Sequence, residues 1–511
     1  MKRIAVIAAA CIIALCAVQG AVAEGKKDAP AAAGQPEKIK IFANFNPEVL
    51  ETDTRIFAEA EKALGVKIEF EIPPSASYNE RTQIMLAGGD YPQLVLFNDT
   101  NDKIYIDAVN SGAVLPIGKY VAASPNLQKY SYKVSWDAMK VKGDGEIYGM
   151  PRTSIARADG FIVRRDWLNK VGLGSIKDGE AVTLDQFTEI LRRFSKNDPD
   201  GNGKNDTYGF AQAAGGDGSL PVIGQVEWAF DLTGWRQYSD EAAKYLDPKF
   251  SRNKDNYKRA IEYSAALWKE GLFDPDFPVV KREASIQRFK QGITGVIGEF
   301  AGWIPQYVDD IKKLDPSVEL GYIVGIKNSK GVVQGGSFGT GTWGVWGVMN
   351  SAKKPEKVVA LVDWLLGDQG WEYLKYGVEG VTFKTENGVR VPTADYNKWN
   401  SVGWNRRFVR RNDDPDFFIP LNMTEANKVK IKAYIATCIQ QASFSMDRGY
   451  RPPVANDPRL IDYNKKWLEG ISKMVVGADS TAGFGALLDG WYKNGGDEYV
   501  KQMNEFIAKS Q

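Results

Sequence analysis

The stretch Ile39 to Phe97 decides the fold, and its last part reads Leu86-Ala-Gly-Gly-Asp-Tyr-Pro-Gln-Leu-Val-Leu-Phe97. Residues 66–72 alternate apolar with charged side chains, which is the period of a strand. The apolar run 94–97 suits a buried parallel strand. A further strand is expected from Ile39 toward Asn46. The stretch therefore contributes three strands.

Two helices are expected between these strands. The first presents apolar residues on one face from Ile56 to Leu64 and stops at Gly65, and the second covers about 79–86. Strands that alternate with helices form a mostly parallel sheet with right-handed crossovers. Ligands of such sheets bind beyond the carboxyl ends of the strands. This rule places a site at the loops 44–47, 73–78 and 98–101.

Composition narrows the class of function. A chain of 511 residues can form about two to three domains. Its 65 basic and 64 acidic residues leave no net charge that favours nucleic acid or an anionic membrane. The chain has no histidine, which excludes Ser-His-Asp and Cys-His catalysis and histidine-bound metals. Its 14 tryptophans suit sugar or peptide surfaces as well as cores.

The N-terminus has the pattern of an export signal. Basic Lys2 and Arg3 precede an apolar run, residues 4–18, that is short for a transmembrane helix. Ala21-Val-Ala23 fits a cleavage site, so we expect residues 1–23 to be removed. Residues 24–37, rich in Ala, Lys, Gly and Pro, then form a flexible leader.

Lipid attachment is the alternative for the N-terminus. Cys16 or Cys11 could carry the lipid, although Leu15 precedes Cys16 where a small residue is usual, and the apolar run before Cys11 is short. Cleavage after Ala23 leaves Cys438 as the only cysteine, so no internal disulfide forms. We expect an exported protein, periplasmic or at the cell surface, that is soluble or lipid-anchored.

The sharpest local motif is Asp198-Pro-Asp-Gly-Asn-Gly-Lys-Asn-Asp206. Oxygen-bearing side chains occupy positions 1, 3, 5 and 9 of a calcium loop, and glycine occupies position 6. Lys204 at position 7 would offer only its carbonyl. The alternative is a surface turn, which Asp, Asn and Gly form without metal. We predict structural calcium at Asp198, Asp200, Asn202, Lys204 and Asp206, although Gly209 replaces the glutamate usual at position 12.

Gly339-Thr-Gly-Thr-Trp-Gly344 matches the letters of a dinucleotide-binding loop. That loop needs a helix after it, and residues 345–349 predict a strand. We therefore expect a tight turn or a close backbone approach here. Trp343 and Trp346 could serve as core residues or as platforms for sugar rings.

Other segments give simpler expectations. Residues 354–374 predict one amphipathic helix, and the tail predicts helices over 422–438, 458–476 and 485–509. A cluster of arginines at 406, 407, 410 and 411 is interpreted as a solvated, salt-bridged face, with contact to an acidic ligand as the alternative.

Taken in order, several short motifs resemble the extracellular solute-binding proteins of ABC importers, family 1, in the long branch that binds oligosaccharides. Each motif is weak alone, but the ordered set spans nearly the whole chain after the leader. The motifs are Ala87-Gly-Gly-Asp-Tyr-Pro92, Gly145-Glu-Ile-Tyr-Gly-Met-Pro151, Val163-Arg-Arg-Asp-Trp-Leu168, Asp198 to Asp206, Lys269-Glu-Gly-Leu-Phe-Asp-Pro275, Tyr376-Gly-Val-Glu-Gly380, Met474-Val-Val-Gly477 and Trp491-Tyr-Lys-Asn-Gly-Gly496.

The resemblance implies an α/β, two-lobe periplasmic-binding-protein fold, type II-like, with mixed sheets flanked by helices and a hinge between the lobes. By similarity, residues 38–152 and 334–400 form the first lobe, and residues 153–333 and 401–511 the second. A cleft between the lobes closes on a ligand, and the closed form is presented to the transmembrane subunits of a permease. The resemblance implies binding without catalysis, by a monomer, with an oligosaccharide as ligand.

Candidate ligand-binding residues follow from the strand ends, the aromatic residues and the first crossing segment. They are Asn44, Asn46, Asn98, Asp99, Arg152, Arg157, Trp303, Trp343 and Glu379. Turn capping, core packing or surface charge is the alternative for each. The rival functions are a secreted glycoside hydrolase, which needs two carboxylates about 5–10 Å apart, and a peptide- or lipid-binding relative on the same fold.

Overall fold

The computed structural model describes most of the chain after the leader. Its described residues are 36–44, 55–74, 77–154, 159–211, 224–280, 282–335, 340–397, 399, 407–411 and 419–509. The expected signal segment, Cys11, Cys16, Asn46, Arg157 and Arg406 lie outside these ranges. None of the described helices is both long and apolar enough to cross a bilayer.

The first sheet confirms the expectation for the stretch 39–97. Its strand order is β2-β1-β3-β11-β4, in which β1 runs parallel to β2 and to β3. β11 runs antiparallel to both β3 and β4. The strands are β1 (Glu37–Phe42), β2 (Val66–Glu71), β3 (Leu94–Phe97), β4 (Met150–Thr153) and β11 (Thr342–Val348).

Local sequence explains these first elements. In β2 the first four residues alternate between buried and exposed, and all four residues of β3 are buried. Helix α2 (Arg55–Leu64) ends before Gly65, and α3 (Tyr78–Gly88) ends before Gly89. Both glycines have positive φ, 61° and 74°, which glycine adopts without the steric cost of a side chain.

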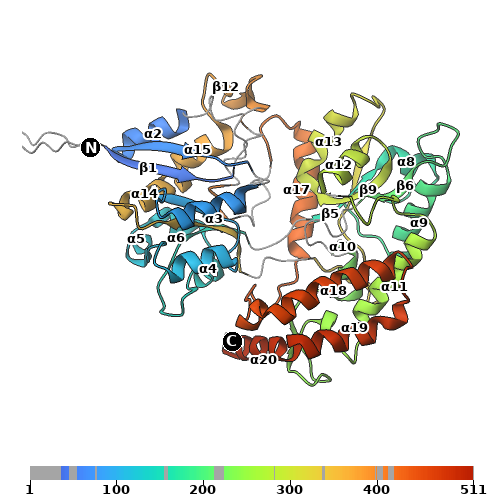
Figure 1. The fold of residues 1–511 in the computed structure, drawn as a ribbon. Coiled ribbons are helices and arrows are strands. Elements are labelled where there is room, and N and C mark those ends of the chain that lie inside the picture. The colour runs from blue at the N-terminus through green and yellow to red at the C-terminus, as the bar shows by residue number, and fades with distance from the viewer. Residues whose placement is uncertain are drawn as a thin grey trace, which may run out of the picture. The chain divides into compact units, whose positions relative to one another are not determined.

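One predicted helix is two helices. The segment 354–374 forms α14 (Pro355–Leu366) and α15 (Asp368–Tyr376), separated at Gly367 with extended backbone. A Cβ at Gly370 would lie 2.2 Å from the carbonyl oxygen of Trp364, so the second helix folds back closely onto the first. Figure 1 shows α14 and α15 beside α2, and both helices contact α2.

The remaining helices around the first sheet are short. Their apolar residues join one core that also contains the strands and α14. They are α4 (Lys103–Asn110), α5 (Gly118–Ala122), α6 (Pro125–Tyr130) and α7 (Lys133–Asp137).

The second sheet has its own cores. Its strand order is β10-β5-β9-β6, with β6 and β9 parallel and the other neighbours antiparallel. The strands are β5 (Asp159–Arg164), β6 (Tyr208–Ala211), β9 (Thr294–Phe300) and β10 (Leu320–Ile323). The helices that join these cores include α8 (Arg165–Lys170), α9 (Leu184–Lys196), α12 (Arg282–Lys290), α13 (Ile304–Ile311) and α17 (Glu425–Gln440).

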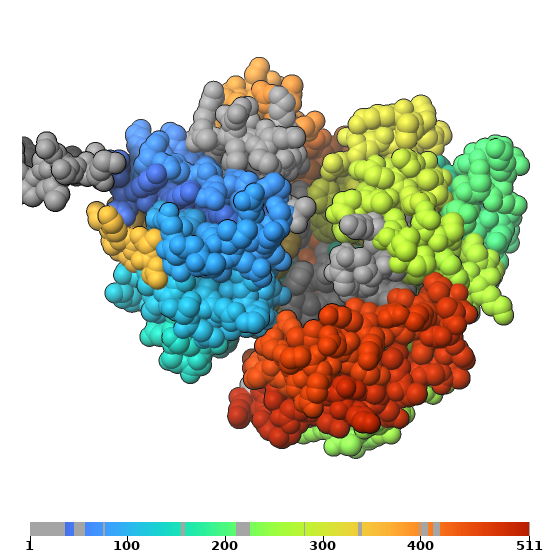
Figure 2. Space-filling model, viewed as in Figure 1, coloured from blue at the N-terminus to red at the C-terminus, as the bar shows by residue number. Residues whose placement is uncertain are grey.

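The C-terminal helices complete the larger of these cores. They pack with α11 (Asn256–Lys269) and appear as one block, coloured red, in Figures 1 and 2. The predicted last helix, 485–509, is interrupted, because Gly495 and Asn494 depart from helical angles in a π-turn, η10 (Tyr492–Gly496). The helices are α18 (Pro458–Val475), α19 (Phe484–Trp491) and α20 (Asp497–Lys509).

Small elements connect the larger ones. Two hairpins pair β7 (Arg236–Gln237) with β8 (Tyr245–Leu246) and β12 (Phe383–Glu386) with β13 (Val389–Pro392). The short helices are α10 (Gly224–Glu227), η3 (Trp228–Phe230), η4 (Pro248–Phe250), η5 (Ala301–Trp303), η8 (Pro453–Asn456) and η9 (Thr481–Gly483). Two sheets with separate cores form two lobes; the exact boundaries given above stay a prediction.

Candidate functional site

One edge of the first sheet gathers most of the described candidate residues. Register places Phe97 of β3 opposite Val345, and Thr153 of β4 opposite Thr342. The carboxyl ends of β1, β3 and β4 therefore share an edge with the start of β11. Asn44, Asn98, Arg152 and Trp343 lie at these strand ends.

Amide side chains form a short chain at this edge. The Asn44 Nδ2 donates to Asn98 Oδ1 over 3.4 Å, and the Asn98 Nδ2 donates to Asn79 Oδ1 over 2.8 Å. Asn79 comes from the first turn of α3, and the sequence did not single it out. Asp99 accepts the Asn101 N–H at 2.9 Å, which is the turn-capping role named as its alternative. Amides that both donate and accept suit sugar hydroxyls.

Arg152 and Trp343 lie together at the same edge. The Arg152 Cζ lies 4.9 Å from the centroid of the Trp343 ring, a cation–π distance. A Cβ at Gly344 would lie 2.9 Å from the carbonyl oxygen of Phe97, so the close approach of the backbone favours glycine beside Arg152. Burial, and then the nearby charge of Arg407, lower the pKa of Arg152 to about 9. These two candidates are thus brought together.

Arg407 joins the site although the sequence placed it on a solvated face. Its Nη2 donates to the carbonyl oxygen of Asn44 over 3.0 Å. Its own carbonyl accepts from Trp346 Nε1 at 2.9 Å, and Trp346 stacks on Phe408 with ring centroids 4.7 Å apart. Trp346 is therefore a core residue that fixes the Arg407 backbone. Arg410 fits the expected salt-bridged face better, because its Nη2 lies 2.9 Å from Asp368 Oδ1.

Two candidates lie elsewhere. Trp303 is half-buried at the end of η5, directly after β9 of the second sheet. Glu379 is exposed in the turn between α15 and β12, where its backbone bridges to Phe383. Neither residue belongs to the amide and arginine group of the first sheet.

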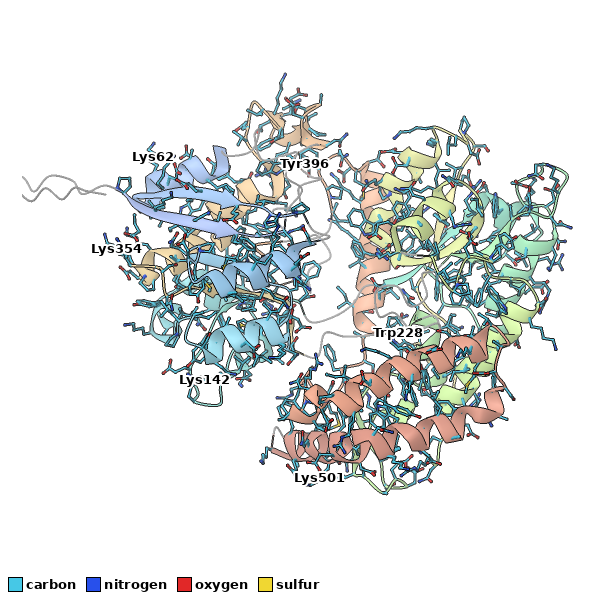
Figure 3. The ribbon with its side chains drawn as sticks, viewed as in Figure 1. Lys62, Lys142, Trp228, Lys354, Tyr396 and Lys501 are labelled. Carbon is cyan, nitrogen blue, oxygen red and sulfur yellow. The ribbon has the colours of Figure 1, made fainter. Side chains whose placement is uncertain are left out.

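The second sheet has polar groups at its corresponding edge that sequence reasoning missed. Glu299, near the end of β9, pairs with Arg282 and lies 3.4 Å from the Tyr307 hydroxyl. Burial, and then the Glu299 charge, raise the pKa of Tyr307. Trp228, labelled in Figure 3, lies half-buried on η3. These groups could be placed at the edge only from the register of β9 with β5 and β6, because the pairing of strands is not visible in the sequence of one strand.

The predicted calcium loop has converging oxygen atoms. Asp198 accepts backbone N–H groups at 2.9–3.0 Å, from Asn202 and Gly201 on one oxygen and Gly203 on the other. Asp200 and Asp206 both accept from the Asn202 amide, at 2.9 and 3.1 Å. Burial, and then a hydrogen bond with Asp198, raise the pKa of Asp200.

These contacts fit a cation, because two carboxylates already point at one donor. Lys204 contributes an N–H to Asn202 Oδ1 at 2.8 Å. Within the described ranges, however, no three acidic or cysteine side chains are gathered to hold a metal by themselves. Any ion here would also need amide or carbonyl oxygens.

Packing explains why position 12 is glycine. Gly209 lies in β6, where a Cβ would be 2.6 Å from Leu191 Cα of α9. Its N–H donates to Ser195 Oγ of the same helix at 2.9 Å. A glutamate cannot fit between strand and helix, so the loop loses its usual bidentate ligand.

Comparisons with known proteins agree on the family. Residues 46–370 match the family described as "Bacterial extracellular solute-binding protein". The chain is 26% identical over 479 residues to the polygalacturonan/rhamnogalacturonan-binding protein YtcQ of Bacillus subtilis, covering 89% of each chain. It is 26% identical over 506 residues to Lipoprotein LipO of the same organism, covering 94% of each.

Solved structures support the fold. The alginate-binding protein AlgQ2, in a structure described as lacking calcium ion, matches with a TM-score of 0.68 at 19% identity, over 93% of this chain and 99% of that one. FusA of Streptococcus pneumoniae in complex with kestose matches with a TM-score of 0.66 at 16% identity, over the same shares. These matches confirm the predicted two-lobe α/β fold. A family that binds solutes without catalysis also rules out the rival hydrolase.

Proposed function

Since the chain belongs to the family 1 extracellular solute-binding proteins of ABC importers, we propose that it captures a carbohydrate, an oligosaccharide, and delivers it to a membrane permease. The observation that carries the proposal is the chain of amides from Asn44 through Asn98 to Asn79, at the sheet edge where β11 begins with Thr342 and Trp343. Sugars offer hydroxyls to amides and a flat apolar face to an indole.

Each residue then has a defined task. Asn44 and Asn98 hydrogen-bond hydroxyls, and Trp343 stacks on a sugar ring. Trp303 and Glu299 of the second lobe meet the ligand when the lobes close by hinge bending. The lobes are those expected above: 38–152 with 334–400, and 153–333 with 401–511.

Relatives lend support to the ligand and partner classes. FusA is named a fructooligosaccharide ABC transporter substrate-binding protein, and it is 27% identical to this chain over 237 residues. YtcQ is named for pectic polysaccharides. We propose the transmembrane subunits of an ABC permease as the partner, with a monomeric binding protein and no nucleic acid.

Thermal unfolding with a panel of oligosaccharides tests the function. A ligand that binds only the folded protein raises the melting temperature. At a ligand concentration of one hundred times Kd, it adds about 2.7 kcal/mol to the free energy of unfolding. We expect a shift without cleavage of the sugar, and a smaller shift for Asn98→Ala and Trp343→Ala. Asn422→Ala is the matched control, because Asn422 donates to another amide, Asn397, at 2.6 Å on the surface.

Two results would contradict the function. One is turnover of the added sugar, which a binding protein does not perform. The other is a stabilisation by peptides or lipids with none by any sugar, which would favour the peptide- or lipid-binding alternative. Asn46, Asp99, Arg157 and Glu379 remain candidates that the same assay tests by alanine substitution.

We also propose that the loop Asp198 to Asp206 holds structural calcium. The convergence of Asp200 and Asp206 on the Asn202 amide supports it. Hard oxygen ligands of this kind suit calcium, which would tie the loop to the adjoining strand β6. One relative with a similar fold is described as an EF-hand mutant of FusA.

Chelation tests the calcium proposal. We expect a chelator to lower the melting temperature and added calcium to restore it, because binding to the folded state alone is stabilising. Asp206→Asn should remove most of this response. If neither the chelator nor added calcium changes the melting temperature, the loop is an Asx turn without metal.

For the N-terminus we propose cleavage after Ala23, with lipid on Cys16 or Cys11 as the competing outcome. The similarity to Lipoprotein LipO supports anchoring, and the Ala21-Val-Ala23 pattern supports cleavage. Intact-mass measurement of the protein from its native membrane fraction and medium distinguishes a free N-terminus at Glu24 from a lipidated cysteine.

A further inference from the structure

We infer that the second sheet carries a separate ligand site, a cavity that takes the oxyanion of a small molecule. The cavity lies at the edge of the sheet where β9 begins, beside the loop from Asp198 to Asp206. Its volume is about 340 Å³, within the range of small-molecule sites. The inference goes beyond the proposed function, because this cavity is not the carbohydrate site.

The length of β9 separates the cavity from the residues proposed to meet the sugar. Gln291 and Gly292 line the cavity and come just before the strand. Glu299 and Trp303 lie near its end and directly after it. The strand has seven residues and rises about 3.3 Å at each, so its two ends are roughly 20 Å apart. A small ligand in the cavity would therefore leave the carbohydrate site open.

Four parts of the second lobe form the walls of the cavity. They are α8 with the residue before it, the loop from Asp198 to Asp206, the turn between α12 and β9, and the end of α13 with the turn that follows. The charged residues of the walls are Arg164, Lys170, Lys290, Asp166, Asp200 and Asp315. Because cations and carboxylates are equal in number, the ligand class depends on which of these groups already have partners.

The carboxylates of the walls already accept hydrogen bonds on each oxygen. Asp166 accepts from the Arg164 Nε at 2.9 Å and from its Nη2 at 2.5 Å. Asp315 accepts from the same Nη2 on one oxygen and from the Ser317 hydroxyl on the other, both at 2.6 Å. Asp200 accepts from the backbone and the side-chain amide of Asn202, at 3.4 and 2.9 Å. These acceptors therefore serve donors of the protein itself.

Two buried donors of the walls lack an acceptor among the described residues. Arg164 is only 3% exposed, and its Nε and Nη2 bond Asp166 and Asp315. Its Nη1 is left over, 3.5 Å from where a Cβ at Gly292 would lie. Trp167 is 2% exposed, and its Nε1 has no hydrogen-bond partner in the described structure. A buried donor without an acceptor is costly, so a ligand that supplies acceptors would offset this cost.

Lys170 supplies the charge that attracts an anion. Its Nζ would lie 2.2 Å from a Cβ at Gly201, so the ammonium lies against the backbone of the loop at the cavity wall. Lys290 is different, because it pairs with Asp310 at 2.7 Å. The Arg164 charge is already matched by Asp166 and Asp315. Within the described part of the chain, Lys170 has no ion pair.

An oxyanion matches the groups that remain. Guanidinium, indole and ammonium nitrogens donate hydrogen bonds and accept none, so the ligand must bring the acceptors. Hydrogen bonds between a cation and an anionic oxygen are also stronger than neutral ones. Leu314, 70% exposed in the wall, offers an apolar contact to the rest of the ligand. A small molecule that carries a carboxylate, phosphate or sulfate fits this description.

Calorimetry on the full chain tests the site with inorganic phosphate, sulfate and acetate. Chloride at the same ionic strength is the comparison, because it carries the charge without the oxygen acceptors. We expect at least one oxyanion to bind saturably to one site, and chloride not to. Tighter binding of phosphate or sulfate would assign a tetrahedral group, and tighter binding of acetate a carboxylate. If none of the three oxyanions binds, the inference is wrong.

Variants place the binding in this cavity. Lys170→Gln should weaken it about tenfold, the loss expected when a hydrogen bond to a charged group is removed. Trp167→Phe keeps the ring and removes the Nε1 donor, so it should also weaken binding. The Lys170 variant carries the test if the buried Trp167 variant does not fold. Lys177→Gln is the control, because Lys177 is 76% exposed and does not line the cavity.

The outcomes keep this site distinct from the proposed function. Oxyanion binding that Lys170→Gln leaves unchanged, or that Lys177→Gln weakens equally, would overturn the cavity as the site. Lys170→Gln should leave the melting shift produced by an oligosaccharide unchanged, and a loss of that shift would contradict the separation of the two sites. If no sugar binds but an oxyanion does, the proposed function fails and this inference stands.

Discussion

Replacing Lys249 by methionine should strongly destabilise the second lobe. The Lys249 Nζ lies 2.7 Å from Glu227 Oε2, and the Glu227 side chain is only 7% exposed. Burial opposes the Lys249 charge, but the Glu227 and Asp247 charges outweigh it and raise its pKa. Burial raises the pKa of Glu227 as well. The raised pKa of Lys249 favours a charged pair, whereas the raised pKa of Glu227 favours a neutral carboxyl group. The 2.7 Å contact favours the ionised pair near neutral pH.

The magnitude follows from the carboxylate left behind. Removing one partner of a buried ion pair costs about 3–5 kcal/mol, because the other charge stays buried without compensation. Lys249 keeps 22% of its surface exposed, so we expect the lower end, about 3 kcal/mol. Glu227→Gln with Lys249→Met should recover much of this loss, since no charge then remains.

Urea unfolding at several pH values measures the effect. Without Lys249, the folded pKa of Glu227 lies above its unfolded value near about 4.3. The destabilisation is therefore full above the folded pKa and fades as pH falls toward the unfolded value. Lys254→Met is the control: its partner Asp240 is 63% exposed, so the loss should stay within about 1 kcal/mol.

Two results would refute the reasoning. One is a loss below about 1 kcal/mol for Lys249→Met, which would mean that the Glu227 carboxylate is hydrated or protonated in the native protein. The other is a double variant whose loss equals the sum of the two single losses, which would show that the groups do not interact.

Three further predictions concern single groups. Gly209→Glu restores the usual ligand at position 12 of the calcium loop. It should lower the free energy of unfolding in urea by about 1–3 kcal/mol or more, because its Cβ would overlap Leu191. An unchanged or raised stability would contradict the close packing of β6 on α9. Asp144→Asn should bring the Tyr148 pKa, raised to about 12 chiefly by its hydrogen bond to Asp144, back toward about 10 in an ultraviolet titration. Burial raises the pKa of Cys438 to about 12, so we expect a thiol reagent to modify it only on unfolding; rapid reaction of the folded protein would refute its burial.

Local pattern was enough for many elements of the fold. The alternation in β2, the apolar run of β3 and the stop glycines after α2 and α3 are encoded within a few residues of each element. Helix α9 is a similar case, because the cap that begins it is local: Thr183 and Gln186, three residues apart, form a capping box. Pattern failed where a tertiary contact intervened, as at Gly367, where close packing splits one apolar stripe into α14 and α15.

The stretch 39–97 by itself determined that strands and helices alternate and that ligands meet the carboxyl ends of the strands. The spacing of Asp and Asn residues alone also predicted which side-chain oxygen atoms come together in the loop from Asp198 to Asp206. Only the tertiary structure decided that Asn79 and Arg407 complete the edge where Asn44, Asn98 and Arg152 lie. The physical reason is that charge and hydrogen bonding act through space: Arg407 is 363 positions from Asn44 in the chain yet 3.0 Å from its carbonyl oxygen.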